Sequence, residues 1–356
     1  MKRCKNCLMP GNYPNIDFDE KGICDYCTGK KYFGLTANPE IRTVMKNPEK
    51  LIKDFHDTVK DCRGSGDHDC LVAVSGGKDS SYLAYLLKEK YNLNILTMTV
   101  DTGLLGNVAK ENIDHLVNRL SIDHFYVTPR PDFFKKIYQY YIQHPKLKKE
   151  NDEEIGFINT VCPKCCKAID SLILKEAVKR NISVIFLGYT PEEIEDYCYF
   201  YEIPREEIAE KSWLPKEFDS SFFSEEDRSY FWNPFKEKVL RYPRIVYPFH
   251  VTDCLTRNET IKRCKELSLV KKPHPRATDC ILKPLLMYLD LKTLGYNSYI
   301  QNVSYNIREK KTSLSRREWL FLLTIGDCLG KSGLYKKRDM NNALEYLNIG
   351  LKDLLK

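Results

Sequence analysis

The chain of 356 residues is longer than one average domain, and 42% of its residues are hydrophobic, which is enough for a sizeable core. Its 56 basic and 49 acidic residues leave a formal charge of +7. This excess suits a phosphate-bearing ligand but is weaker than the concentrated charge of most nucleic-acid-binding proteins. No apolar run reaches the length of a membrane span, and the N-terminus lacks the apolar core of a signal peptide. We therefore expect a cytoplasmic protein without a membrane partner.

Two C-x-x-C pairs open the chain, with sixteen residues between them: Cys4 with Cys7, and Cys24 with Cys27. Each pair can hold one edge of a tetrahedron, so four thiolates at this spacing are typical of a closed Zn²⁺ site. A segment of about thirty residues is too short to fold on its own apolar core, so the metal would supply its folding energy. We predict a structural zinc-binding module over residues 1–35.

Strand and helix patterns alternate in the region that follows, which we assign to a nucleotide-binding domain over residues 48–190. Strand patterns cover residues 70–74, 94–100, 124–128 and 183–187, and helical patterns cover residues 48–62, 80–90, 107–120, 132–141 and 167–180. This alternation predicts an α/β fold with a doubly wound parallel sheet. Ligands of such sheets lie at the carboxyl ends of the strands. The segments that should converge there are residues 75–80, 101–103 and 188–190.

The first of these segments is a Ser-Gly-Gly-Lys-Asp-Ser turn between a strand and a helix. It consists of Ser75, Gly76, Gly77, Lys78, Asp79 and Ser80. Glycines at such a turn let backbone N–H groups approach phosphate oxygens, and the helix N-terminus adds a partial positive charge. A Walker loop has a Lys-Ser/Thr pair after a longer glycine loop, whereas here an aspartate follows the lysine. We predict a different phosphate loop, which binds a phosphate-bearing ligand.

Four residues near these strand ends have predicted roles. Lys78 would neutralise charge on a departing pyrophosphate, and Asp79 would hold Mg²⁺ between phosphates. Asp101 either reaches the adenosine or a magnesium ion, or only forms the turn before Gly103. Gly188 would line the nucleotide site. The acidic run behind it is either a solvated helix start or a group that serves the acceptor or a metal: Glu192, Glu193, Glu195 and Asp196.

A second group of cysteines lies inside the chain. Cys162, Cys165 and Cys166 precede the helical pattern of residues 167–180 and should lie near the nucleotide. Cys280 is the candidate third ligand, with Cys254 as its rival. Three thiolates would leave a metal ion or an iron–sulfur cluster with one open position. A structural zinc or a persulfide-carrying dithiol are the alternatives. We interpret the single cysteines as buried apolar residues: Cys62, Cys70, Cys198, Cys264 and Cys328.

The rest of the chain is less regular. Residues 191–282 combine aromatic, proline and charged residues, and we assign them to an insertion that binds the acceptor, with a helix over residues 257–267. Most of the aromatic side chains there should serve packing. Residues 283–356 have helical patterns and form the predicted C-terminal lobe.

The phosphate turn resembles the loop of the PP-loop ATP pyrophosphatases. The opening Cys4-Lys5-Asn6-Cys7-Leu8-Met9-Pro10, the internal Cys162-Pro163-Lys164-Cys165 and the tail are similar to the N-acetyl sugar amidotransferases of that superfamily. The resemblance implies that ATP is cut between its α and β phosphates and that AMP is attached to the acetamido oxygen of an N-acetyl sugar. Ammonia would then replace AMP to give an acetamidino group. A separate glutaminase subunit would supply the ammonia.

Residues 191–280 match that family poorly. Tyr247-Pro248-Phe249 followed by Cys280 is closer to the PP-loop sulfurtransferases, which thiolate tRNA or small molecules, some of them through a three-cysteine iron–sulfur cluster. In this alternative Cys162, Cys165 and Cys280 would act with a sulfur donor, and tRNA stays open as the acceptor. A non-catalytic nucleotide-binding or zinc-scaffold protein is the third interpretation, and the intact loop argues against it.

Overall fold

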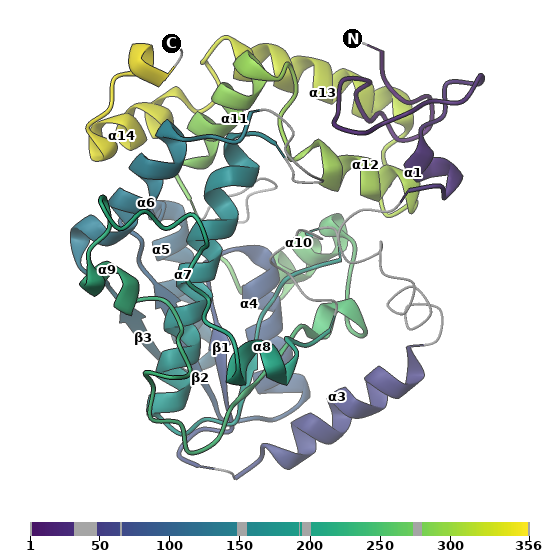
Figure 1. Ribbon diagram of the computed structural model, residues 1–356. Helices are drawn as coiled ribbons and strands as arrows, with labels where there is room; N and C mark the ends of the chain where they lie inside the picture. Colours follow the sequence, from purple (N-terminus) through teal and green to yellow (C-terminus); the bar gives the residue numbers. More distant parts are fainter. Residues whose placement is uncertain are drawn as a thin grey trace. The chain divides into compact units, whose positions relative to one another are not determined.

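The computed structural model describes most of the chain, namely residues 2–31, 48–64, 66–147, 155–191, 193, 201–272 and 280–354. The chain forms two compact units. The helical unit comprises residues 1–37, 135–165 and 280–356, and the sheet unit comprises residues 38–134 and 166–279. Two helices, α6 (Pro131–Gln143) and α7 (Phe157–Lys179), contribute residues to both units (Figure 1).

The sheet unit contains five parallel strands in the order β3-β2-β1-β4-β5. They are β1 (Cys70–Ala73), β2 (Ile95–Val100), β3 (Asp123–Val127), β4 (Val184–Phe186) and β5 (Arg244–Val246). Every residue of β2 is buried, as expected for an inner strand with both faces covered. Val72 of β1 pairs with Thr97 on one side and with Phe186 on the other. The predicted α/β fold with a parallel sheet is confirmed.

One strand was not predicted. The three residues of β5 lie inside the segment that the sequence assigned to an insertion, and they pair with β4. Three residues are too few to show a periodic pattern, and Pro243 and Pro248 flank them closely. The pairing with β4 therefore depends on a neighbour that lies about sixty residues earlier in the chain.

Helices of the sheet unit bury their apolar sides against a common core that includes Phe55, Leu83, Ile113 and Phe186. They are α3 (Glu49–Asp61), α4 (Lys78–Tyr85) with its π-helical continuation η2 (Leu86–Lys90), α5 (Asn107–Leu120), the short η3 (Pro248–His250) and α10 (Arg257–Glu266). The sheet unit also contains α8 (Arg205–Ala209) and α9 (Glu225–Ser229). The predicted helix over residues 107–120 has the bounds of α5, and α4 packs against α10 (Figure 1). Aromatic residues of the 191–248 region are largely buried, as predicted, with Trp213 and Trp232 among them.

The helical unit contains the predicted C-terminal helices. They are α11 (Lys283–Thr293), α12 (Ile300–Arg308), α13 (Arg316–Lys331), α14 (Lys337–Leu347) and the short η4 (Leu351–Leu354). Both α13 and α14 pack against α11. The N-terminal cysteine module, with α1 (Asp25–Thr28), shares an apolar cluster with Tyr296 and Ile300. Arg3 also pairs with Asp327 at 2.7 Å. The module and the C-terminal helices therefore belong to one compact unit.

Candidate nucleotide site and cysteine clusters

The phosphate loop joins β1 to α4. Gly77 is the N-cap residue of α4 in an extended conformation, and no side chain caps the helix there. The N–H groups of the first turn, which a helix leaves without intrahelical acceptors, are thus available to an anion. Two hydroxyl groups shape the loop: Ser80 Oγ accepts a hydrogen bond from the N–H of Ser75 at 3.2 Å, and Ser81 Oγ donates to the Gly77 carbonyl at 2.8 Å.

Two glycines allow the backbone of the loop to pack closely against neighbouring segments. Gly76 has φ +74°, and an added Cβ would lie 2.3 Å from the carbonyl oxygen of Ala109 on α5. Gly188 follows β4, and a Cβ there would lie 3.1 Å from Cα of Ser80. Gly76 therefore requires glycine for the loop to keep its form, whereas a side chain at position 188 would press on the Ser80 backbone. The close approach of Gly188 to Ser80 shows that the first and third predicted segments meet at the same sheet edge.

Lys78 and Asp79 open α4 and form an ion pair with each other. Their side chains are largely buried, with 15% and 21% exposure. Behind the loop, the thiol of Cys264 donates to the Lys78 carbonyl at 3.3 Å. Burial raises the pKa of Cys264 to about 12, so this thiol stays protonated and is no nucleophile.

Asp101 follows β2 and forms the turn that was one of its two predicted roles. Its carboxylate accepts a hydrogen bond from the N–H of Gly103 and pairs with Lys110, both at 2.9 Å. A contact with the nucleotide stays a prediction. After β4, Glu193 accepts a hydrogen bond from the N–H of Thr190 at 3.1 Å. Three other members of the predicted acidic run lie outside the described residues, as does Cys198: Glu192, Glu195 and Asp196.

The internal cysteines lie within a helix, not before one. α7 begins at Phe157, ten residues before the predicted start, and contains Pro163. A tertiary contact favours this start, because the carboxylate of Asp290 accepts a hydrogen bond from the Phe157 N–H at 2.6 Å. Burial raises the pKa of Asp290 to about 6. Cys162 and Cys165 are thus one helical turn apart on one face.

These thiols are half-buried, and the Tyr138 hydroxyl lies 3.2 Å from the Cys165 sulfur. Cys280 is also half-buried and precedes α11, whereas its rival Cys254 is exposed in the sheet unit. A shared cluster of Cys162, Cys165 and Cys280 stays a prediction. Cys62, Cys70 and Cys264 are buried as predicted, but the prediction for Cys328 is wrong. Cys328 is exposed because it lies on the outer side of α13.

The four N-terminal cysteines come together as predicted. Within the described residues, Cys4, Cys7, Cys24 and Cys27 are the thiols whose sulfur atoms lie within 4.8 Å of one another. Three are fully buried. The N–H groups of Asn6 and Cys24 donate to the Cys4 sulfur at 3.4 and 3.3 Å, which favours its thiolate form. Four converging, buried sulfur ligands fit a tetrahedral metal ion.

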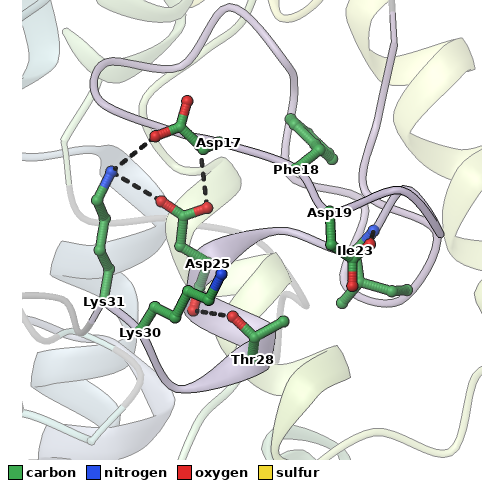
Figure 2. Close-up of a pocket in the computed structure, with 8 residues that line it drawn as sticks. All are labelled: Asp17, Phe18, Asp19, Ile23, Asp25, Thr28, Lys30 and Lys31. Atoms are coloured by element: carbon green, nitrogen blue, oxygen red, sulfur yellow. Dashed lines mark hydrogen bonds and ion pairs between the residues drawn. The ribbon is translucent and has the colours of Figure 1, made fainter.

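A charged network supports the second pair of this cluster. Asp25 is only 6% exposed, accepts a hydrogen bond from the Asp17 N–H at 3.1 Å and pairs with Lys31 at 2.7 Å. These residues surround a pocket next to α1 (Figure 2). Its lining consists of Asp17, Phe18, Asp19, Ile23, Asp25, Thr28, Lys30 and Lys31. Lys31, which pairs with both Asp17 and Asp25, links the segment that carries Cys24 and Cys27 to the loop before it.

Comparisons with known proteins support the interpretation of the loop. No protein-family model matches the chain. An uncharacterised protein of Methanocaldococcus jannaschii is 29% identical over 123 residues, which are 34% of this chain and 40% of that protein. The GMP synthase of Aliivibrio fischeri (strain MJ11) is 26% identical over 148 residues, which are 35% of this chain and 28% of the enzyme. The chain thus spans less than half the length of these relatives.

The glycine-rich loop lies on a parallel sheet, and the GMP synthases match the chain. Together these findings support the PP-loop ATP pyrophosphatase superfamily. Two solved structures are similar over most of the chain, although both at low sequence identity. The U34-tRNA thiolase of Methanococcus maripaludis has a TM-score of 0.33 and 16% identity, and covers 88% of this chain and 90% of its own. The NMN synthetase of Francisella tularensis has a TM-score of 0.36 and 12% identity, and covers 76% and 97%.

One residue that holds the phosphate loop in place was not predicted from the sequence. Asn112 of α5 is 2% exposed, and its amide donates to the Gly76 carbonyl at 3.0 Å. Its side-chain oxygen accepts a hydrogen bond from the Lys272 N–H at 3.0 Å. A polar residue between Ala109, Ile113 and the other apolar positions of α5 was a usable signal, because a buried amide needs partners.

Proposed function

We propose that the protein is an ATP-dependent transferase that adenylates an acceptor oxygen and releases pyrophosphate. The observation that carries this proposal is the uncapped start of α4 behind Gly76 and Gly77. The first-turn amides can donate hydrogen bonds to phosphate oxygens, and Lys78 adds a cation at the same point. These donors suit a diphosphate group that gains charge as it departs.

In the adenylation step, the acceptor oxygen attacks the α-phosphorus of ATP. The bond from the α-phosphorus to the bridging oxygen breaks, and this oxygen leaves with the pyrophosphate. Lys78 and the loop amides would neutralise the charge that develops on it. Asp79 would exchange its pairing with Lys78 for a magnesium ion that binds the phosphates.

For the second step we propose ammonia as the nucleophile and an N-acetyl sugar as the acceptor. Ammonia attacks the acetamido carbon, the bond from this carbon to the adenylated oxygen breaks, and AMP leaves. The product is an acetamidino group. Two findings support nitrogen transfer: the motif resemblance from the N-terminal cysteines to the tail, and the similarity to GMP synthases that are named as glutamine-hydrolysing. A separate glutaminase subunit would supply the ammonia.

Sulfur transfer is the second candidate, and the cysteines of α7 favour it. Cys162 and Cys165 lie one turn apart, and Tyr138 contacts the Cys165 sulfur. Two neighbouring thiols can carry a persulfide or, with Cys280, hold an iron–sulfur cluster. The acceptor would then be tRNA or a small molecule. For the separate N-terminal cluster we propose zinc in a structural role, because its four ligands leave no open position.

The first experiment follows phosphorus from ATP labelled at either the α or the γ position. We expect the γ label in pyrophosphate and the α label in AMP. Lys78→Ala should abolish both products, whereas Lys262→Ala, which removes a charge that is 76% exposed, should change neither. Terminal phosphoryl transfer that leaves ADP would overturn the proposal.

The second experiment separates the two nucleophiles. An N-acetyl sugar nucleotide should consume ATP with ammonium salts and yield a product with one additional nitrogen by mass spectrometry. Metal analysis of anaerobically purified protein should find zinc alone. Iron with acid-labile sulfide, and a thiolated product, would favour the sulfurtransferase instead.

A further inference from the structure

An apolar stripe runs along the exposed side of α13. The side chains of Phe321, Leu322, Ile325 and Leu329 are 65%, 40%, 41% and 40% exposed, and Leu334, just beyond the helix, is 62% exposed. Helical spacing places the first four on one side. Half of the ten exposed large hydrophobic side chains in the described residues lie within these fourteen positions. A concentration of this kind marks an interaction surface, whereas scattered single residues do not.

The opposite side of α13 is held by its own unit. Leu323 packs on the apolar cluster of the cysteine module, and Asp327 pairs with Arg3 at 2.7 Å. Gly330 lies against Leu291 of α11, where an added Cβ would come within 2.4 Å of its side chain. The helix therefore cannot turn its stripe inward without losing these contacts.

Basic residues flank the stripe at both ends. Residues 308–339 hold nine basic and four acidic residues, an excess of five charges out of the seven of the whole chain. Arg316 and Arg317 are exposed before the stripe, and Lys331, Lys337 and Arg338 are exposed after it. A net positive segment thus surrounds this apolar exposed surface.

We propose that α13 is a peripheral membrane-binding helix that takes up anionic lipid headgroups and lays its apolar stripe among the acyl chains. Helices of this kind combine Phe and Leu on one side with Lys and Arg beside them, and they lie in the plane of the interface. The sequence predicted no membrane partner, because it contains no spanning run. Among the described helices none has the length and apolarity to cross a bilayer, but a helix that lies on the surface needs neither.

Other occupants fit these side chains less well. RNA is bound through aromatic stacking, but four of the five stripe residues are aliphatic. Protein interfaces are depleted in lysine, which is present here beside the stripe. Two copies of the chain could pair through antiparallel α13 helices. Arg317 of one copy would then lie close to Lys331 of the other, and the two positive charges would repel each other.

The test is co-sedimentation of the full-length protein with vesicles, without ATP, so that its outcome does not depend on the proposed reaction. Vesicles of phosphatidylglycerol and phosphatidylcholine should bind the protein, and binding should weaken with salt. Pure phosphatidylcholine vesicles should bind it far less. The double variant Phe321→Ser/Ile325→Ser should bind more than about tenfold more weakly. The variant Arg317→Gln/Lys331→Gln should lose about twentyfold.

Matched controls come from the sheet unit. Phe235→Ser removes a side chain that is 79% exposed, and Lys179→Gln/Lys262→Gln removes two exposed lysines. Both should bind as the unchanged protein does. The proposal is overturned if anionic vesicles are not bound at low salt, or if the stripe variants bind equally well. RNA binding that only the charge variant loses would assign the surface to nucleic acid. A change of molar mass in the stripe variants, measured by light scattering, would assign it to a protein contact.

Discussion

The chain contains C-x-x-C pairs in two regions, and the structure uses them differently. Near the N-terminus, Cys4 and Cys7 flank a turn, Cys24 and Cys27 lie at the start of the short helix α1, and the four sulfur atoms come within 4.8 Å of one another. In α7, Cys162 and Cys165 have the same spacing on a regular helix. In the N-terminal module, two pairs from separate segments bring their thiols to one point, whereas in α7 a single pair lies along one face of a long helix. Spacing alone therefore does not distinguish one half of a four-thiolate metal site from two thiols on one face of a helix.

The largest expected effect lies in the N-terminal cluster. Cys24→Ser should lose the bound metal and destabilise the helical unit by more than about 3 kcal/mol, because metal binding supplies folding energy. Elemental analysis and thermal unfolding measure both effects. Cys328→Ser, in the same unit but exposed, should keep the metal and its melting temperature. A Cys24→Ser protein with full metal content would show that the four thiols do not act together.

Gly76→Ala tests whether the phosphate loop tolerates substitution less well than the rest of the chain. The new Cβ would collide with the Ala109 carbonyl at a positive φ, so we expect a loss of about 2–4 kcal/mol of stability and at least about a hundredfold loss of pyrophosphate release. Gly326→Ala on α13 meets no atom within 4 Å and should stabilise the helix by about 0.5–1 kcal/mol. Unimpaired turnover in Gly76→Ala would refute the assigned role of the loop.

Asp170 is a buried carboxyl group on α7, four residues after Cys166, and it makes stability depend on pH. Burial raises its pKa to about 7, against the weaker opposite effect of Lys167. A carboxyl with a raised folded-state pKa holds its proton longer than in the unfolded chain. Stability should therefore fall as pH rises from about 4 to 7 and level off above, by roughly 2–4 kcal/mol. Urea unfolding of Asp170→Asn at pH 5 and pH 8 should lack this fall. The variant Asp57→Asn, at an exposed position, should retain the fall in stability. If both variants show the same dependence of stability on pH, the fall is not due to Asp170.

The smallest expected change in stability concerns the second cysteine region. Cys165→Ser should alter the free energy of unfolding by less than about 1 kcal/mol, because the side chain is half-buried and a hydroxyl can still contact Tyr138. Pyrophosphate release should persist. If the second step uses these thiols, product formation stops while adenylation continues. If Cys165→Ser instead lost metal and unfolded as Cys24→Ser does, both cysteine regions would have a structural metal site.

Strong local patterns predicted much of the fold and of the candidate site. The helix over residues 107–120 and the Ser-Gly-Gly-Lys-Asp-Ser turn were visible because periodicity and glycine chemistry act over neighbouring residues. β5 was missed because its pairing with β4 spans a long stretch of chain. The early start of α7 depends on Asp290, which lies more than 130 residues away.

By itself, the sequence determined the phosphate loop, the parallel sheet and the grouping of the N-terminal cysteines, since each arises from residue types at fixed short spacing. Only the tertiary structure decided that Asn112 holds the loop, that the internal thiols lie on a helix, and that the apolar side of α13 faces outward. Those outcomes depend on which surface each element buries. Burial is settled by contacts among distant segments, which no local pattern contains.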